Sequence, residues 1–214
     1  MARVDGEEGV EGEHRLLTTF LLHPFHPPRP LQPLAAVLPP SDALLRTLAA
    51  VPPSSRVLDL GCGTGRHTDA LVRLGFDVYA CASAPEDVEA ARARVRGVLG
   101  DESDVRVTAA RPAALGYPDD FFDWVIAYGA YDGAGDAAAL SEMLAETRRV
   151  LQPGGWVWAA VHERAVGAGA APEALTGLFE AAGFALAEQP QEEAEGGERL
   201  LRGIYRKVDE TTPL

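Results

Sequence analysis

Apolar and polar positions recur with two different periods between residues 56 and 208, and this pattern predicts strands separated by helices. Short apolar runs predict strands over residues 56–60, 77–82, 104–110, 121–130, 156–162, 185–189 and 199–208. Helical spacing with glycine or proline near the ends predicts helices over residues 66–75, 85–100, 136–151 and 171–184. Strands that alternate with helices indicate a parallel sheet.

The end of the chain departs from this alternation. Only the acidic, glycine-bearing stretch 191–198, which we interpret as a solvated turn, separates the last two strand-like runs. A short connection of this kind joins antiparallel neighbours. The sequence therefore predicts an α/β fold with one doubly wound, seven-stranded, mostly parallel sheet and an antiparallel last strand.

The pattern before residue 54 is different. Residues 1–13 are acidic and polar, and we expect them to be a disordered lead. Residues 14–53 carry many prolines and large apolar side chains, which predicts an arm or lid with short helices near 14–22 and 41–50. The main domain is then expected over 54–208, followed by a tail at 209–214.

Charge and composition narrow the range of partners. The chain has 19 basic and 32 acidic residues, and its net charge of −13 disfavours nucleic acid and anionic membranes as partners. No apolar stretch reaches about 18 residues, and the first residues do not resemble a signal peptide. The two cysteines do not make a disulfide framework, so a reducing cytoplasm is the expected compartment. Nothing in the sequence indicates the oligomeric state.

The stretch VLDLGCGTGRHT, residues 57–68, joins a strand to a helix through a glycine bend. Glycines let a ligand approach the backbone closely, and a helix start offers free N–H groups. The dinucleotide fingerprint G-x-G-x-x-G is not met, because Arg66 stands where its third glycine would be. The phosphate-binding loop pattern also fails, since no Gly-Lys-Ser/Thr follows. What remains is Asp59-x-Gly61-x-Gly63-x-Gly65.

This bend resembles the first motif of the class I S-adenosylmethionine-dependent methyltransferases (type 11-like), and the resemblance covers about residues 54–208. Three further segments are similar, in order, to that family's fourth strand, its following helix and fifth strand, and its later helix: DDFFDWVIAYGAYD, EMLAETRRVLQPGGWVWAAV and LTGLFEAAGF. The resemblance implies a Rossmann-like fold and S-adenosylmethionine as cofactor. It implies a cofactor site at Asp59, Gly61, Cys62, Gly63, Thr64, Gly65, His67, Ala82, Ser83, Arg111, Pro112, Ala113 and Tyr128.

Two positions depart from the family pattern. The family's second strand usually ends in an acid that binds both ribose hydroxyls, but Ala82 stands here. The family often places another acid near the adenine amine, but the matching residue is Arg111, which can only donate. Ser83, or Glu86 or Asp87 folding back from the next helix start, are candidates to replace the ribose acid. Arg111 is a candidate to stack on the adenine.

Three interpretations remain open. Our principal hypothesis is a methyltransferase that acts on a small molecule by in-line methyl transfer with rearranged cofactor contacts. The alternatives are a fold that has lost the reaction and acts as a binding or scaffold protein, and a site for a different, anionic nucleotide-like ligand. No metal site is expected, because methyl transfer from a sulfonium needs none and because His23 and His26 lack further ligands.

The catalytic group is unknown, and its candidates are His162, Tyr128 and Tyr131. These residues follow the fourth and fifth strands, and open α/β sheets bind ligands beyond the carboxyl ends of their strands. His162 is either a general base or a surface residue, and the tyrosines either line the acceptor site or bridge core and surface. His67 is either a ligand contact or a packing residue. Cys81, Trp156 and Trp158 are expected to pack in the core, whereas Cys62 lies inside the glycine loop, where a small residue is needed.

Overall fold

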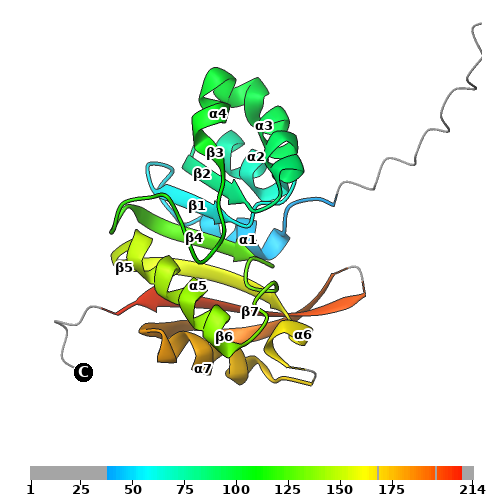
Figure 1. Cartoon of the computed structure of the whole chain (residues 1–214), viewed down its shortest axis with the longest axis vertical. Coiled ribbons are helices and arrows are strands. Elements are labelled where there is room, and N and C mark those ends of the chain that lie inside the picture. The colour runs from blue at the N-terminus through cyan, green and yellow to red at the C-terminus, as the bar shows by residue number, and fades with distance from the viewer. Residues whose placement is uncertain (1–37, 168, 196, 209–214) are drawn as a thin grey trace, which may run out of the picture. The chain divides into compact units, whose positions relative to one another are not determined.

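The computed structural model describes residues 38–167, 169–195 and 197–208 (Figure 1). The predicted lead 1–13, the helix near 14–22, the arm up to residue 37 and the tail 209–214 lie outside these residues. The described elements are α1 Asp42–Leu48, β1 Arg56–Leu60, α2 Arg66–Arg73, β2 Asp77–Ala82, α3 Pro85–Leu99, η1 Gly100–Glu102, α4 Ser103–Arg106, β3 Val107–Ala109, β4 Phe122–Tyr128, α5 Ala137–Val150, β5 Leu151–His162, α6 Glu163–Val166, α7 Pro172–Ala181, β6 Phe184–Glu195 and β7 Glu198–Lys207.

The strands form one sheet in the order β3-β2-β1-β4-β5-β7-β6 (Figure 1). Strands β1 to β5 pair in parallel, and β7 runs antiparallel to both of its neighbours. This arrangement confirms the predicted fold class. The chain order reverses between β1 and β4, and such a switch point leaves a crevice beyond the carboxyl ends of the two strands.

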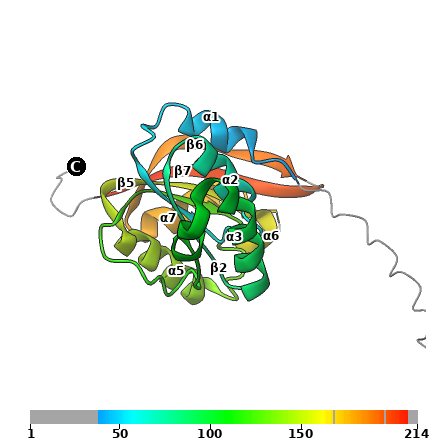
Figure 2. The same cartoon turned by 90° about the horizontal axis from the view of Figure 1, so that it is seen from above.

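Helices cover both faces of the sheet (Figure 2). On one face, α1 and α2 pack Leu44, Leu48 and Leu71 against strand residues that include Ile126 and the fully buried Trp158. The other face is covered by α5 and α7, whose apolar side chains join a larger core cluster. Helix α1, which we had assigned to the N-terminal arm, thus contributes to the same core as the strands.

The third strand is shorter than predicted. Residues 104–106 belong to helix α4, and β3 contains only Val107–Ala109. The apolar alternation misled the prediction, because Val105 is 70% exposed and does not face the core. Strand β3 lies at the edge of the sheet, and its three residues pair only with Ala80–Ala82 of β2.

The predicted acidic turn is also wrong. Strand β6 continues to Glu195, and residues 192–195 pair with β7. Two of the acids are stabilised in the strand by arginines of β7, in the pairs Glu192–Arg199 and Glu193–Arg202. Pairing of β7 with β5 ends at His162 and Leu200, so the end of the β6–β7 hairpin reaches past β5. This overhang brings hairpin residues to the carboxyl edge of the sheet.

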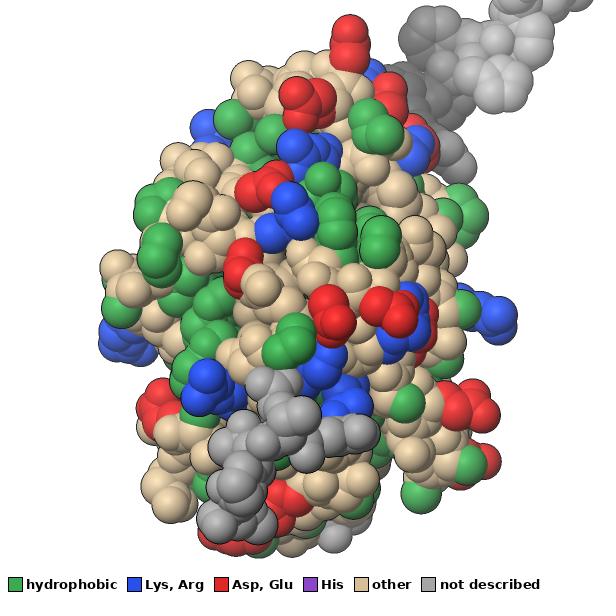
Figure 3. All heavy atoms as spheres, turned by 90° about the vertical axis from the view of Figure 1, so that its left-hand side faces the viewer, with side chains coloured by type: hydrophobic (Ala, Val, Ile, Leu, Met, Phe, Trp, Pro, Cys, Tyr) green, Lys and Arg blue, Asp and Glu red, His purple; other side chains and the backbone are tan. Residues whose placement is uncertain are grey.

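The opposite edge, at the amino ends of the parallel strands, carries basic and acidic side chains side by side (Figure 3). Arg56 and Asp77, the first residues of β1 and β2, form an ion pair of 3.1 Å there. This mixed surface offers no single-sign field to a polyanion. Among the described residues, no helix is both long and apolar enough to cross a membrane.

Candidate functional site

The glycine loop between β1 and α2 holds three glycines at positive φ: Gly61 at +69°, Gly63 at +50° and Gly65 at +79°. Two of them are close-packed. A Cβ on Gly61 would lie 3.0 Å from Ala130, and one on Gly65 would lie 2.9 Å from Ala91. A Cβ on Gly63 would meet nothing within 4 Å. Gly63 therefore faces open space at the switch point, where a ligand can approach its backbone.

Asp59 supports this loop from behind. Its side chain is buried, and one carboxylate oxygen accepts a 2.6 Å hydrogen bond from the Thr68 hydroxyl of α2. Burial raises the pKa of Asp59 to about 6, although its hydrogen bonds with Thr68 and the charge of Arg66 act in the opposite direction. This hydrogen bond joins β1 to α2, and the expected place of Asp59 against the cofactor stays a prediction.

The end of β2 offers no carboxylate. Ala82 is buried, and the hydroxyl of the exposed Ser83 lies 3.4 Å from the carbonyl of Ala110. The acid that faces this region is Asp87 of α3. It lies one helical turn before Ala91, the residue that touches Gly65, and therefore on the same helix face.

The charge of Asp87 also acts on the loop. Burial is the main cause that raises the pKa of the Cys62 thiol above its ordinary range, and the charges of Asp59 and Asp87 contribute. An acid on α3 is therefore within electrostatic range of the glycine loop. Glu86, the other acid at this helix start, is exposed.

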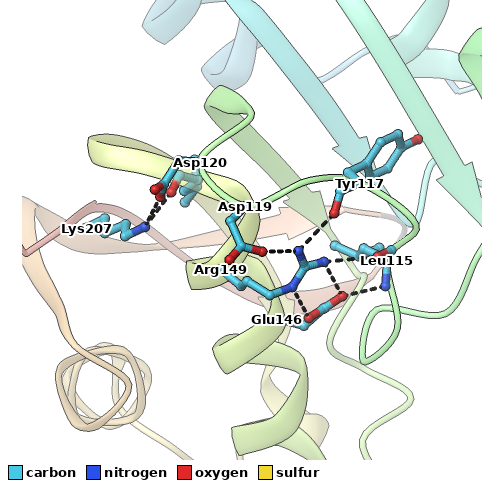
Figure 4. A network of polar contacts seen from close by, with 8 residues as sticks. Leu115, Tyr117, Asp119, Asp120, Glu146, Arg149 and Lys207 are labelled. Carbon is cyan, nitrogen blue, oxygen red and sulfur yellow. Dashed lines mark hydrogen bonds and ion pairs between the residues drawn. The ribbon is translucent and has the colours of Figure 1, made fainter.

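The loop that follows β3 carries the predicted adenine-side residues Arg111, Pro112 and Ala113. Arg111 forms an isolated backbone bridge with Ala114, and its side chain is exposed. Arg149 of α5 holds the next part of this loop, as Figure 4 shows. Its guanidinium pairs with Glu146 and Asp119 and donates to the carbonyls of Leu115 and Tyr117.

At the carboxyl end of β4, Tyr128 lies within a polar cluster. The Arg66 guanidinium lies 4.5 Å from the Tyr128 ring centre and donates two 2.9 Å hydrogen bonds to Glu195 of β6. The Tyr128 hydroxyl donates to the same carboxylate. Burial and this carboxylate raise the pKa of Tyr128, so its hydroxyl stays protonated near neutral pH and is not a base in this arrangement.

His67 packs against Tyr128 and makes one polar contact. Its Nε2 accepts a 3.2 Å hydrogen bond from the Ser41 N–H at the start of α1, and its ring centre lies 4.9 Å from that of Tyr128. Burial, with a smaller contribution from the charge of Arg66, lowers the pKa of His67 to about 4. A neutral imidazole at pH 7 is what this acceptor role requires.

His162, at the end of β5, lies between two carboxylates. Its backbone N–H donates to Asp132 at 2.9 Å, its Nδ1 contacts the same carboxylate, and its Nε2 lies 2.8 Å from Glu198 of β7. Arg164 pairs with Glu198 at 2.7 Å. Since carboxylates accept, both ring contacts are hydrogen bonds at once only when His162 carries two protons.

A cavity of about 370 Å³ adjoins the His162–Asp132 pair, because Asp132 lies in its wall. It lies between the loop after β4, helix α6 and helix α7, with Asp132 and Arg164 in its wall beside Leu140, Val166 and Leu178. A cavity of this size suits a small molecule. No group of three or more His, Cys, Asp or Glu side chains within the described ranges is arranged to hold a metal ion.

Comparisons with known proteins agree with this fold. Residues 57–155 match a family model described as a methyltransferase domain. An uncharacterized methyltransferase of Mycobacterium tuberculosis is 34% identical over 115 residues, which cover 51% of this chain and 42% of the relative. A ubiquinone biosynthesis O-methyltransferase of Xanthomonas campestris is 33% identical over 126 residues, which cover 59% of this chain and 50% of the relative.

The fold is shared with the 1,6-didemethyltoxoflavin-N1-methyltransferase of Burkholderia thailandensis, solved with bound 1,6-didemethyltoxoflavin and S-adenosylhomocysteine. The TM-score is 0.62 at 23% identity, covering 78% of this chain and 76% of that chain. Together these matches support a class I S-adenosylmethionine-dependent methyltransferase family for the matched segment, residues 57–155. It spans about half the length, or less, of the curated relatives that it matches.

The methyltransferase fold does not bring all predicted site residues together. Tyr131 is 1% exposed, and its hydroxyl lies 3.0 Å from Thr147 in the core, so it is not placed to contact a substrate. Cys62 and Cys81 are both buried free thiols, and burial raises the pKa of Cys81 to about 12. Trp158 is buried and stacks on Tyr128, as expected for a packing residue.

Sequence reasoning missed three contributors to the site: Arg66, Glu195 and Glu198. Arg66 was seen only as a missing glycine, and the two glutamates were assigned to a solvated turn. In the structure, residues 192–195 alternate in exposure as a strand does, but their sequence Glu-Glu-Ala-Glu has no apolar alternation that would indicate a longer strand. The family match ends at residue 155, before the hairpin that carries both glutamates.

Proposed function

We propose that this protein transfers the methyl group of S-adenosylmethionine to a small-molecule acceptor. The observation that carries the proposal is the open space in front of Gly63. The two neighbouring glycines are required by packing, whereas Gly63 has no neighbour that would exclude a side chain. Gly100 has the same freedom but follows α3, whereas Gly63 lies beyond the carboxyl end of β1 at the switch point, where its open backbone can meet a ligand.

The residues present fit the cofactor at the glycine loop, and they fit the ribose through a different acid. In the proposal, the backbone from Gly61 to Gly65 lies against the cofactor. Asp87 accepts hydrogen bonds from the ribose hydroxyls in place of the acid that Ala82 does not supply. Its position one turn before the Gly65–Ala91 contact supports this assignment. Arg111 is the proposed stacking partner of the adenine.

When bound, S-adenosylmethionine supplies a methyl group on a positively charged sulfur, which needs no further activation. The chain's own task is then to hold the acceptor in line and to take up any proton that it loses. His162 is the candidate acceptor of that proton, since Asp132 contacts Nδ1 of its ring and also lines the cavity. This role requires Glu198, which lies 2.8 Å from Nε2 of His162, to give up that contact.

A small-molecule acceptor is supported by the cavity of about 370 Å³ and by the net charge of −13. The matched relatives include a ubiquinone biosynthesis O-methyltransferase, and a protein of the same fold is an N1-methyltransferase. Oxygen and nitrogen acceptors both fit this range. An acidic protein does not attract the long anionic backbone of a nucleic acid.

A second candidate function is ligand binding without methyl transfer. Ala82 at the end of β2 favours it, because the ribose acid is missing from its usual place. The two candidates differ in cofactor affinity. A working enzyme binds S-adenosylhomocysteine in the micromolar range, whereas a fold that has lost its cofactor binds it only after Ala82→Asp restores the acid.

Calorimetric titration with S-adenosylhomocysteine tests the proposal, with Gly63→Ala as the key variant and Gly100→Ala as its matched control. Gly63 and Gly100 have φ of +50° and +58°, and a Cβ on either meets nothing within 4 Å. Gly100 also has a ψ of −134°, outside the left-handed helical region, so Gly100→Ala strains the backbone at least as much as Gly63→Ala does. Only Gly63→Ala is expected to weaken binding, by tenfold or more. Equal affinities in the two variants would contradict the proposed site.

A further inference from the structure

Arg66 and Glu195 form a two-pronged ion pair that joins distant parts of the chain. Nη1 of Arg66 donates to Oε1 of Glu195, and Nη2 donates to Oε2, both at 2.9 Å. This fork-to-fork geometry is how arginine recognises a carboxylate selectively. Nη1 also donates to the carbonyl of Pro39 at 3.2 Å, which fixes the guanidinium plane.

Tyr128 completes a site for one carboxylate. Its hydroxyl donates to Oε2 of Glu195, and its ring lies under the guanidinium. The Glu195 carboxylate therefore receives three donors from two side chains. Burial alone would raise the pKa of Glu195, but the hydrogen bonds from Arg66 and Tyr128 hold it below the ordinary value.

The donors and the acid have different places in the fold. Arg66 follows the last glycine of the loop directly, and Tyr128 ends β4, so both belong to the walls of the crevice. Glu195 comes from the overhanging end of the β6–β7 hairpin. The Arg66 side chain is 16% exposed, whereas that of Glu195 is 31% exposed. Arg66 and Tyr128 are thus part of the crevice itself, and Glu195, which binds to them, is more exposed than Arg66.

A cavity of about 260 Å³ lies beside the pair, with Tyr128 and Glu195 in its wall together with Ser41 and Arg46. A ligand in this cavity would meet the Tyr128 hydroxyl where Glu195 now accepts its proton. Replacement of one carboxylate by another leaves the arginine paired throughout. Exchange therefore avoids the cost of an unpaired, partly buried guanidinium.

We propose that Arg66 and Tyr128 form a binding site for the carboxylate of a small-molecule ligand, and that Glu195 fills this site until the ligand replaces it. The assignment rests on the proposed function for the ligand's position in the crevice. Two ligands can supply the carboxylate: the amino-acid end of the cofactor, or an acidic methyl acceptor. In both cases Glu195 competes with the ligand and lowers its apparent affinity.

The test compares Glu195→Gln with Glu192→Gln in calorimetric titrations. The control lies on the same strand and also loses an arginine pair, Glu192 with Arg199, away from the crevice. Three probes are titrated: S-adenosylhomocysteine, its decarboxylated analogue, and benzoate as a simple carboxylate. Melting temperatures of both variants establish that the proteins are folded.

If the cofactor supplies the carboxylate, Glu195→Gln binds S-adenosylhomocysteine on the order of tenfold more tightly, and the decarboxylated analogue is unaffected. If the acceptor supplies it, both adenosyl probes are unaffected and benzoate binds to Glu195→Gln but not to the natural protein. In either case Arg66→Lys weakens binding of the probe whose affinity Glu195→Gln raised, since lysine lacks the planar fork of arginine. Glu192→Gln leaves every affinity unchanged.

Equal gains for S-adenosylhomocysteine and its decarboxylated analogue would overturn the proposal, because the hairpin would then exclude ligands of any charge. Identical behaviour of Glu195→Gln and the natural protein with all three probes would overturn it too. Failure of both adenosyl probes to bind any variant would refute the proposed function instead. The benzoate titration would still decide whether Arg66 and Tyr128 receive a carboxylate.

Discussion

Asp59 gives the sharpest quantitative prediction, because its carboxylate is buried beneath the glycine loop. Burial raises its pKa from 3.8 to about 6. The native protein therefore binds this proton more tightly than the unfolded chain does. The contribution of Asp59 to stability is complete below pH 3.8 and is lost as the pH rises through about 6.

The size of this effect follows from the shift of about 2 pKa units. Each unit corresponds to 1.36 kcal/mol, so ionisation of Asp59 costs the native state about 3 kcal/mol at neutral pH. Asp59→Asn removes this cost and keeps an oxygen that accepts from Thr68. The variant should therefore gain stability relative to the natural protein as the pH rises from about 4 to about 6, and the gain should level off above pH 7.

Urea denaturation followed by circular dichroism between pH 4 and 8 measures this difference at each pH. Subtracting the two proteins removes the titration of every other group. Asp69→Asn, on the same helix, controls for the loss of one negative charge. A difference between Asp59→Asn and the natural protein that stays constant across the range would refute the reasoning, as would one of opposite sign. Thr68→Val should move the window to higher pH, since its hydroxyl favours the ionised form.

Three further predictions follow from the packing of the site. Gly65→Ala should destabilise the protein by about 2–4 kcal/mol in urea denaturation, because its Cβ would lie 2.9 Å from Ala91 at a strained φ. Tyr131→Phe should cost about 1 kcal/mol of stability and leave methyl transfer unchanged in a radiolabel assay, and a large loss of activity would return Tyr131 to the catalytic candidates. Asp87→Asn should weaken calorimetric binding of S-adenosylhomocysteine by about tenfold, whereas Glu86→Gln should not, and equal effects would exclude Asp87 as the ribose partner.

The β6–β7 hairpin changes how the catalytic candidates are understood. Glu195 accepts a hydrogen bond from the Tyr128 hydroxyl, and Glu198 contacts Nε2 of His162. Both glutamates come from the overhanging end of the hairpin, where Glu195 of β6 lies opposite Glu198 of β7 in the backbone register. The same element therefore covers the two side chains nearest to the proposed chemistry.

The order of the elements was determined by the sequence alone. Period-two and period-3.6 apolar spacing depends on local geometry, so it marks strands and helices without knowledge of their partners. The glycine motif was also readable, because positive φ at Gly61, Gly63 and Gly65 is a local requirement that few other residues meet. These signals sufficed for the sheet, its antiparallel β7 and the position of the crevice.

Only the tertiary structure decided which side chains meet at the crevice. The sequence around Asp59 does not reveal its hydrogen bond with the hydroxyl of Thr68, which depends on the packing of α2 on β1. Glu195 reaches Arg66 across 129 positions of sequence, because β6 and β7 pair beyond the end of β5. Such contacts depend on register and strand length, which are set by long-range pairing and leave little trace in local composition.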